Sequence, residues 1–185
     1  KLVSLVDARY ITIKDFDMNQ GDGINVSLWL SGCEHKCPGC YSPHTWDFNY
    51  GEPYTEEQTE KILEAMKPEY IKGFSLLGGE PFEKENQAVL CEVLEKIKEA
   101  YPEKTVWCYT GFSYDTDLLT GKICDFSITK RMLDCIDILV DGKFIEEEKD
   151  LSLRFKGSRN QRIIDVKASL KEGKIIRWSE DRIDD

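Results

Sequence analysis

Three cysteines lie within eight residues of the chain, at Cys33, Cys37 and Cys40. This Cys-x3-Cys-x2-Cys spacing lets three thiolates on one short loop converge on a single metal centre. Thiolates are the ligands that zinc and iron–sulfur clusters prefer. Pro38 stiffens the loop, and Gly39 lets the backbone pack closely against a ligand. The spacing therefore predicts a metal centre.

The kind of metal centre depends on the missing fourth ligand. A structural zinc site needs four closed ligands, for which His35 or His44 is available, but no second cysteine pair follows at zinc-ribbon spacing. Both histidines are more simply polar loop residues. A four-iron cluster normally takes four cysteines, so three leave one iron open, as a catalytic centre requires. The spacing favours a catalytic cluster over zinc, and zinc over thiols that bind no metal.

The other four cysteines are scattered through apolar segments and are expected to be small buried hydrophobic residues: Cys91, Cys108, Cys124 and Cys135. A total of seven is odd, which argues against a disulfide framework. Residues 1–7 show no signal-peptide pattern and lack Met, so we expect a trimmed N-terminus and a reducing, cytoplasmic location. No apolar run reaches the roughly 18 residues of a membrane span.

Further candidates follow the predicted strands. Gly78 and Gly79 allow close backbone approach to a ligand, and Glu80 adds a carboxylate; alone, the group also fits a strand-to-helix turn. Asp141 and Lys143 flank a glycine after a later strand; alone, Asp-Gly is a common surface turn. Weaker candidates follow the strand between these two groups: Tyr109, Thr110 and Gly111.

Alternating strands and helices must position these residues. Apolar patterning predicts strands over residues 25–31, 71–77, 105–109 and 137–141. Helices are predicted after a capping box at residues 55–58, over residues 86–100, and around Met132, Leu133 and Ile136. This order is typical of an α/β fold with a mainly parallel sheet, in which loops at the carboxyl ends of the strands build the site.

The chain length limits the architecture. A complete eightfold barrel needs about 250 residues, so 185 residues fit an open, partial β/α barrel in a single domain spanning residues 1–185. After residue 144 the pattern changes to a polar loop. Residues 162–166 and 174–178 are then predicted to pair as a C-terminal hairpin.

The charge balance excludes some partners. The chain carries 25 basic and 35 acidic residues, a net charge of -10. Such a chain repels phosphate backbones, and no basic stripe with interleaved aromatic residues is present. We therefore expect neither nucleic acid nor an anionic membrane as a partner.

The cysteine spacing, followed by Gly-Gly-Glu-Pro after the next strand, resembles the radical S-adenosylmethionine superfamily. Other segments resemble the anaerobic ribonucleotide reductase activating proteins within it: residues 29–33, 37–40, 45–47, 109–111, 140–144, 150–154 and 156–162. The matches extend from about residue 20 to residue 165. The cysteine spacing alone is moderately specific. Its combination with Gly-Gly-Glu and a late Gly-Ser-x-Asn-Gln is highly specific.

Two positions depart from the expected patterns. The superfamily often has an aromatic residue before the third cysteine, near the adenine, where this chain has Gly39; Cys-Pro-Gly-Cys is common in the activating proteins. Adenine packing is then assigned to Tyr41. The late motif usually reads Arg-Gly-Ser-Ser-Asn-Gln, and Lys156 and Arg159 replace two of its positions, which leaves the role of Arg159 open.

The resemblance implies a mechanism. Cys33, Cys37 and Cys40 would hold a 4Fe-4S cluster whose open iron binds the amino nitrogen and carboxylate of S-adenosylmethionine. One-electron reduction, from a donor such as flavodoxin, would cleave the sulfonium bond into methionine and a 5'-deoxyadenosyl radical. That radical would abstract a hydrogen from a glycine Cα of a partner anaerobic ribonucleotide reductase. The cofactor carries the chemistry, and the protein supplies orientation and excludes water.

The resemblance also implies roles for the cofactor-binding candidates. The backbone of Gly78 and Gly79 would bind the ammonium group, with Glu80 as a further acceptor. Asp141 would accept from the ribose or a bound cation, and Lys143 would pair with the carboxylate. The predicted cofactor-binding set is completed by Gly39, Tyr41 and Thr110.

The partner and the alternatives follow from the same comparison. The reductase loop that carries the glycine would cover the open side of the barrel, and residues 150–162 would either meet that loop or pack over the bottom of the barrel. The alternatives are another small radical S-adenosylmethionine enzyme, of the formate-lyase activator or carboxydeazaguanine synthase type, and a non-catalytic zinc-binding module.

Overall fold

In the computed structural model, which describes residues 8–181, strands and helices alternate as the sequence patterns predict. Residues 1–7, where the trimmed N-terminus is expected, lie outside the described residues. The strands are β1 (Arg9–Asp17), β2 (Ile24–Leu30), β3 (Glu52–Pro53), β4 (Ile71–Gly78), β5 (Thr105–Tyr109), β6 (Ile138–Asp141) and β7 (Arg162–Asp165). The helices are α1 (Glu56–Ala65), α2 (Lys84–Ala100), α3 (Phe126–Cys135) and α4 (Val166–Glu172), with 3-10 helices η1 (Pro43–Trp46), η2 (Leu118–Thr120) and η3 (Glu146–Glu148).

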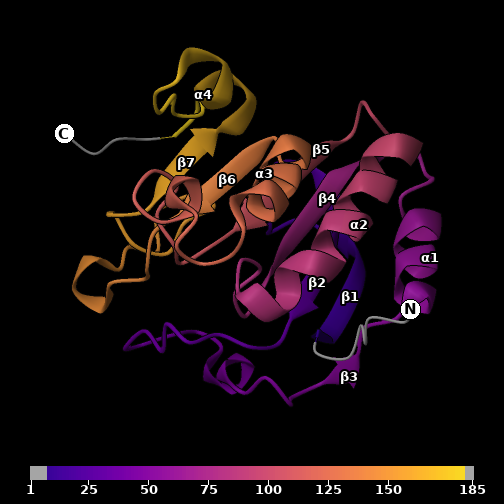
Figure 1. Cartoon of the computed structure of the whole chain (residues 1–185), viewed down its shortest axis with the longest axis horizontal. Helices are drawn as coiled ribbons and strands as arrows, with labels where there is room; N and C mark the ends of the chain where they lie inside the picture. The colour runs from indigo at the N-terminus through magenta and orange to yellow at the C-terminus, as the bar shows by residue number, and fades with distance from the viewer. Residues whose placement is uncertain (1–7, 182–185) are drawn as a thin grey trace.

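The described strands form one open, mixed sheet in the order β3-β1-β2-β4-β5-β6-β7 (Figure 1). Strands β2, β4, β5 and β6 run parallel to one another, whereas β1, β3 and β7 extend the two edges of the sheet in antiparallel pairing. The carboxyl ends of the four parallel strands therefore share one edge. An open α/β sheet that is parallel at its centre confirms the predicted fold class at this level.

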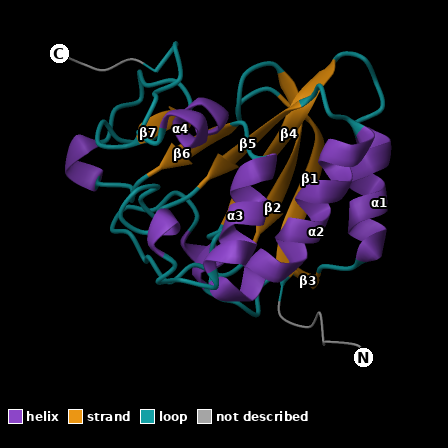
Figure 2. Cartoon of the chain, turned by 45° about the horizontal axis from the view of Figure 1, so that its top comes forward, coloured by secondary structure: helices purple, strands orange, loops and turns teal. Residues whose placement is uncertain are grey.

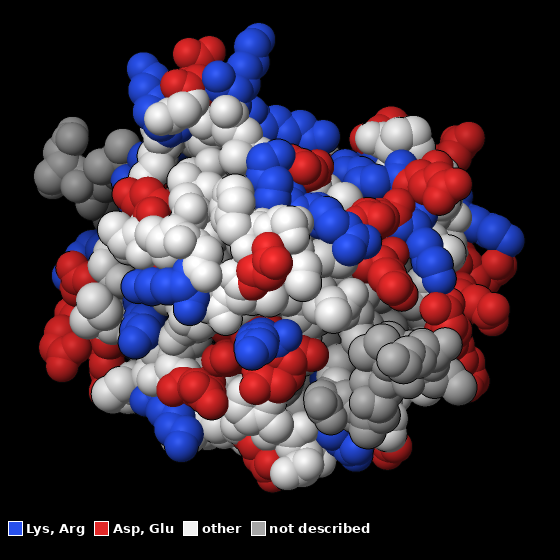
Figure 3. All heavy atoms as spheres, viewed as in Figure 1, with Lys and Arg blue, Asp and Glu red and all other residues white. Residues whose placement is uncertain are grey.

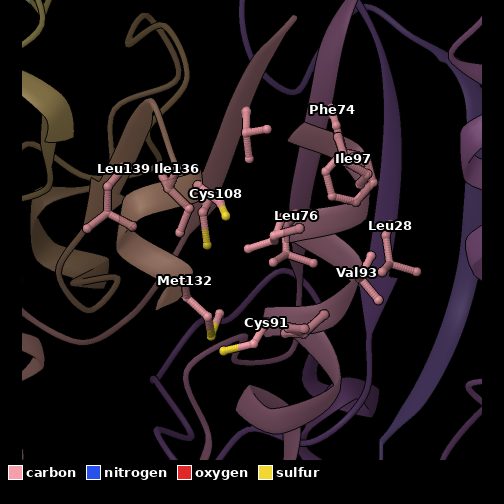
Figure 4. Packing of buried hydrophobic residues seen from close by; sticks show 14 of the residues in the cluster. Leu28, Phe74, Leu76, Cys91, Val93, Ile97, Cys108, Met132, Ile136 and Leu139 are labelled. Carbon is pink, nitrogen blue, oxygen red and sulfur yellow. The ribbon is translucent and has the colours of Figure 1, made fainter. Parts of the chain in front are cut away.

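Helices α1, α2 and α3 cover one face of the sheet (Figure 2). Alternate side chains of the strands point into this layer, since successive strand residues face opposite sides. Figure 4 shows part of the resulting core, in which these sheet residues meet the helices: Leu28, Phe74, Leu76, Cys108 and Leu139. Cys91, Cys108 and Cys135 are buried as predicted, whereas Cys124 is only half-buried in the loop before α3.

Side chains on the opposite face of the sheet form a smaller cluster. Trp107, Ile138, Val140 and Ile163 pack there, and Phe155 and Trp178 from later loops lie against them. The ring centroids of Trp107 and Phe155 are 5.0 Å apart, and those of Trp107 and Trp178 are 5.1 Å apart. Loops rather than long helices thus cover this face, which leaves space at its carboxyl edge.

Local sequence signals explain where the helices begin. Thr55 and Gln58 form the predicted capping box at the start of α1, in which the Thr55 N–H donates to Gln58 Oε1 at 2.7 Å. Helix α2 begins at Lys84, two residues before its predicted start. Strand β1 was not predicted; its pairing with β2 has register irregularities after Tyr10 and Lys14.

The predicted C-terminal hairpin is wrong, because a helix and not a turn connects its two segments. Helix α4 separates the two segments, since Asp165 caps it by accepting from the Ala168 N–H at 3.0 Å and Gly173 ends it with a φ of 67°. Strand β7 pairs with β6, and the later segment adds one isolated antiparallel bridge between Ile164 and Arg177. The two segments do lie together, but through a helix and not a turn.

The surface carries both signs of charge. Figure 3 shows Lys and Arg interspersed with Asp and Glu over the face viewed in Figure 1. Many of these side chains form exposed pairs, such as Arg131 with Glu95 and Lys96 with Glu56. Within residues 8–181, no helix is both long and apolar enough to cross a membrane.

Candidate metal centre

A cavity of about 440 Å³ opens at the carboxyl edge of the parallel strands. It is lined by the three cysteines of the loop after β2, by the Gly-Gly-Glu turn after β4, by Tyr109, Thr110 and Gly111 after β5, and by parts of the loop between β6 and β7. Figure 1 shows these loops extending from the same end of the sheet. The structure therefore brings together candidates that lie far apart in the sequence. Gly39, Asp141 and Lys143 do not line this cavity.

Backbone amides point at all three cysteine sulfurs. The Ser42 N–H donates to Cys40 Sγ at 3.4 Å, the Phe144 N–H donates to Cys37, and amides within the loop donate to Cys33. Hydrogen bonds to sulfur favour the thiolate form and tune the reduction potential of a cluster. The loop reverses direction at Lys36 and Gly39, whose φ values are 48° and 74°.

The metal-free thiols of Cys33 and Cys37 favour the protonated form. Burial raises the pKa of Cys33 to about 12, and the nearby Glu80 charge adds to this effect. Burial also raises the pKa of Cys37, although the Phe144 amide and the positive charge of Lys143 act in the opposite direction. Metal binding must therefore displace protons from these sulfurs, as is usual for thiolate ligands.

The donor set fits an iron–sulfur cluster better than a zinc ion. Within residues 8–181, no three His, Cys, Asp or Glu side chains meet as ligands of one ion. His35 bonds to Glu80 at 2.7 Å, and the ring of His44 lies 5.2 Å from Tyr50, so neither closes a zinc site with the cysteines. Three soft ligands that face one open cavity fit a larger centre with a free position.

The backbone of β2 and of the residues that follow it leaves no space for side chains at Gly78 and Gly79. A Cβ on Gly78, whose φ is 113°, would lie 2.3 Å from the Leu30 nitrogen, and a Cβ on Gly79 would lie 2.6 Å from the Gly32 carbonyl oxygen. The Gly79 and Glu80 amides donate to Leu30 and Gly32 at 2.8 Å each. The glycines therefore hold the chain at the point where it enters the cysteine loop.

Glu80 is fully buried, and its carboxylate is already supplied with donors. Oε1 accepts from His35 Nε2 at 2.7 Å and from the Gly111 N–H at 2.6 Å. Oε2 accepts from the Phe82 N–H at 2.8 Å, and the Thr110 hydroxyl reaches both oxygens. The predicted contact with a ligand ammonium group thus competes with four protein donors. Sequence reasoning treated His35 as a plain loop residue and missed this bond.

Asp141 lies behind the cavity wall. It is 1% exposed, and Arg162 binds both of its oxygens, with Nε at 3.0 Å and a terminal nitrogen at 2.6 Å. The Tyr114 N–H donates to it at 2.8 Å. Because these donors occupy the Asp141 carboxylate, it is not directed at a ribose in the cavity as predicted. Gly142, the next residue, lines the cavity instead. Lys143 is exposed, near Cys37.

The late Gly-Ser-x-Asn-Gln segment braces the cavity wall. Gln161 Oε1 accepts from the Gly157 N–H at 2.8 Å, and its Nε2 donates to the Gly142 carbonyl at 2.9 Å. Asn160 Nδ2 donates to the Lys143 carbonyl at 2.8 Å. Arg159 is exposed, and its backbone N–H donates to Glu148. The motif therefore acts by shaping the loop after β6.

Residues 150–162 extend from the cavity mouth to the other end of the sheet. Leu151 lines the cavity, whereas Arg154 pairs with Asp22 at 2.9 Å, next to the start of β2. Tyr41 also lies at the mouth, with its ring centroid 5.3 Å from that of Phe144. The segment thus packs in part toward the bottom of the sheet, as one alternative predicts, whereas its contact with the reductase loop stays a prediction.

Gly39 packs against a protein side chain. A Cβ at this position would lie 2.8 Å from Glu146 Cδ, and the φ of 74° itself favours glycine. The structure therefore explains Gly39 by the close approach of the cysteine loop to η3.

The comparisons with known proteins agree with this donor set. A family model described as a 4Fe-4S single cluster domain matches residues 19–164. A Vibrio cholerae protein named anaerobic ribonucleoside-triphosphate reductase-activating protein is 37% identical over 147 residues, which cover 78% of this chain and 90% of that protein. Proteins of the same name are 36% identical in Salmonella typhimurium, over 83% of this chain and 96% of theirs, and 31% identical in Enterobacteria phage T4, over 83% and 92%.

Proposed function

Because the chain belongs to the family of anaerobic ribonucleoside-triphosphate reductase-activating proteins, we propose that it installs a glycyl radical on an anaerobic ribonucleoside-triphosphate reductase. The observation that carries this proposal is that three cysteines and the Gly78–Gly79 backbone line one open cavity. The four parallel strands and the site loops at their carboxyl ends also fit a partial barrel of the radical S-adenosylmethionine type.

Cys33, Cys37 and Cys40 hold the 4Fe-4S cluster in this proposal. When bound, the cluster supplies the electron that cleaves S-adenosylmethionine into methionine and the 5'-deoxyadenosyl radical, which takes a hydrogen from the target glycine. The protein's part is to orient the reactants and to keep water out. The backbone amides that donate to Cys33 and Cys37 favour the thiolate forms of these two residues.

Protein groups around the cavity bind S-adenosylmethionine. The backbone of Gly78 and Gly79 forms one wall and accepts from the ammonium group. Tyr41, at the mouth, offers an aromatic face to the adenine. Lys143 lies near Cys37 and is long enough to pair with the carboxylate.

The reductase meets the rim of this cavity. Leu151 is 83% exposed and Tyr41 is 60% exposed, although both side chains line the mouth. Exposed apolar side chains around a reactive cavity are typical of an interaction site. The glycine-bearing loop of the reductase covers this rim, which brings the target hydrogen to the cavity and excludes water before cleavage.

The electron donor approaches from the side of Cys37. Lys36 and Lys143 are both exposed near this cysteine and are complementary to a small acidic electron carrier such as flavodoxin. We place the protein in the reducing cytoplasm, with which its seven unpaired cysteines are compatible.

Anaerobic reconstitution tests the function. The protein, loaded with iron and sulfide, is incubated with S-adenosylmethionine, a reductant and the candidate reductase, and electron paramagnetic resonance records the glycyl radical. We expect a radical that requires S-adenosylmethionine, and none with Cys37→Ala. Zinc without iron after anaerobic purification, or a cluster that never cleaves S-adenosylmethionine, would contradict the proposal.

A further inference from the structure

Glu80 connects three separate segments around the cavity. It is 0% exposed. Its carboxylate receives hydrogen bonds from His35 in the cysteine loop, from Phe82 in its own turn, and from Thr110 and Gly111 after β5. A buried carboxylate is costly unless such donors replace water, so each of these bonds constrains the segment that supplies it.

His35 is the contact from the cysteine loop, halfway between Cys33 and Cys37. Its side chain is 6% exposed, although Glu34 and Lys36 on either side are exposed. The ring lies edge-on to Phe112 at 4.4 Å, and a Cβ on Gly111 would approach it to 2.6 Å. The imidazole is therefore closely packed against Gly111 and Phe112, which follow β5.

A second carboxylate from the same turn holds the neighbouring residue. Glu83 Oε1 accepts from the Glu34 N–H at 3.0 Å. Glu83 is 6% exposed, and burial raises its pKa. The segment from Glu34 to His35 is thus attached to the turn after β4 through its backbone and its side chain.

We propose that His35 and Glu80 act as a positioning pair. The pair fixes the cysteine loop against the turn after β4 and the end of β5. It thereby sets the distance between the cluster and the backbone that binds S-adenosylmethionine. This inference rests on the proposed function, and it replaces the direct contact between Glu80 and the ammonium group.

The two roles of Glu80 predict different mutational patterns. If Glu80 contacts the ammonium group directly, Glu80→Gln weakens S-adenosylmethionine binding and His35→Ala does not. If the residues act as a pair, each variant weakens binding, and the double variant is little worse than either single one, because residues in one hydrogen-bond network are not additive.

The experiment compares four variants: His35→Ala, His35→Gln, Glu80→Gln and the double variant of His35→Ala with Glu80→Gln. Gln at position 35 retains an N–H donor and serves as the conservative rescue. His44→Ala is the matched control, because His44 is the other histidine and contacts Tyr50 instead. The metal-free protein is measured by amide hydrogen exchange over residues 33–40, and the reconstituted protein by its S-adenosylmethionine affinity and reduction potential.

We expect His35→Ala to speed exchange in the cysteine loop and to lower S-adenosylmethionine affinity by roughly 10-fold, as is typical when a supporting residue behind metal ligands is lost. The reduction potential should shift with it, and His35→Gln should recover most of both properties. Wild-type values in His35→Ala, or additive effects in the double variant, would contradict the proposal that His35 and Glu80 act as a pair.

Failure of the pair can be distinguished from failure of the function. If wild-type protein binds no cluster, the proposed function is contradicted, while hydrogen exchange on metal-free protein still reports whether His35 holds the loop. If wild-type protein makes the radical and His35→Ala matches it in every measurement, only the pair is contradicted.

Discussion

At the scale of single residues, six of the seven cysteines separate into two environments, and the seventh, Cys124, is half-buried in a loop outside the cavity. Cys33, Cys37 and Cys40 line the open cavity, whereas Cys91, Cys108 and Cys135 are buried, and Cys91 and Cys108 pack between the sheet and its helices. Of the seven cysteines spread along the chain, the three in one loop are thus the ones that line the cavity.

Cys37→Ala is expected to abolish cluster assembly, because two thiolates do not hold a four-iron cluster that has no other protein ligand. Iron and sulfide per chain, measured after anaerobic reconstitution, check this. Cys124→Ala is the matched control, as Cys124 is half-buried outside the cavity and should leave the iron content unchanged. Equal iron in Cys37→Ala and wild-type protein would rule out this ligand.

Gly79→Ala is expected to impair both cluster assembly and S-adenosylmethionine binding. The added Cβ would lie 2.6 Å from the Gly32 carbonyl oxygen, and this backbone cannot retreat without moving the cysteine loop. A ligand contact alone would affect binding and leave assembly intact. Iron content and cofactor affinity, measured together, distinguish the two; full assembly would show that the loop tolerates the shift. Gly173→Ala is the control: its φ of 67° also strains an added side chain, but nothing lies within 4 Å of the new Cβ and the site is away from the cavity.

At the scale of elements, β6 and β7 are joined by a buried ion pair below the cavity. Arg162 on β7 binds both oxygens of Asp141 at the end of β6, and it also reaches Asp115 at 3.0 Å. The hydrogen bonds that Arg162 donates to Asp141 are the main cause that raises the pKa of Arg162. This pair, together with the loop after β6, shapes one cavity wall.

Arg162→Gln is expected to destabilise the fold by about 3 kcal/mol, because it leaves the buried Asp141 carboxylate without its cation. Urea denaturation of the metal-free protein measures the loss. Arg159→Gln is the control, since Arg159 is exposed and should change stability by less than about 0.5 kcal/mol. Equal midpoints for the two variants would show that Asp141 does not depend on this pair.

The free energy of unfolding should also depend weakly on pH in the acidic range, because of Asp115. Hydrogen bonding to Arg162 holds the pKa of Asp115 at about 2 in the folded chain, below its usual value near 3.9. The contribution is therefore present above about pH 4 and disappears as the pH falls toward 2; the exposed position keeps it below about 1 kcal/mol. Denaturation of Asp115→Asn between pH 2 and 4 should show a shallower slope than wild type, and equal slopes would exclude this contribution.

At the scale of the whole molecule, the two faces of the sheet serve different purposes. Helices α1–α3 seal one face into the main core (Figure 2). Loops cover the other face, and the cavity opens at its carboxyl edge. The cavity thus opens on the face of the sheet that the long helices leave uncovered.

Leu151→Asp is expected to lower the affinity for the reductase about 5- to 10-fold, because a charge replaces an exposed apolar side chain at the cavity mouth, where we propose that the reductase docks. Cluster content and S-adenosylmethionine affinity should stay at wild-type values. Radical yield against reductase concentration measures the effect. Leu119→Asp, on η2 and outside the cavity, is the matched control. Equal curves for wild type and Leu151→Asp would remove this rim from the interface.

The sequence by itself determined the cysteine loop, the alternation of elements and the family. These features depend on neighbours in the chain: cysteine spacing, a capping box at Thr55, and apolar periodicity over α2. Parallel strands then place their carboxyl ends at one edge, so the candidates after β2, β4 and β5 could be assigned to one site before any contact was known.

Only the tertiary structure decided what the polar candidates do. Glu80 and Asp141 follow strands, as site residues should, yet contacts with His35 and Arg162 from distant segments occupy their carboxylates. The helix between the two C-terminal segments likewise has local signals at Asp165 and Gly173 that compete with a hairpin pattern. Which donors reach a buried carboxylate depends on packing between segments far apart in the chain, and spacing along the sequence does not contain that information.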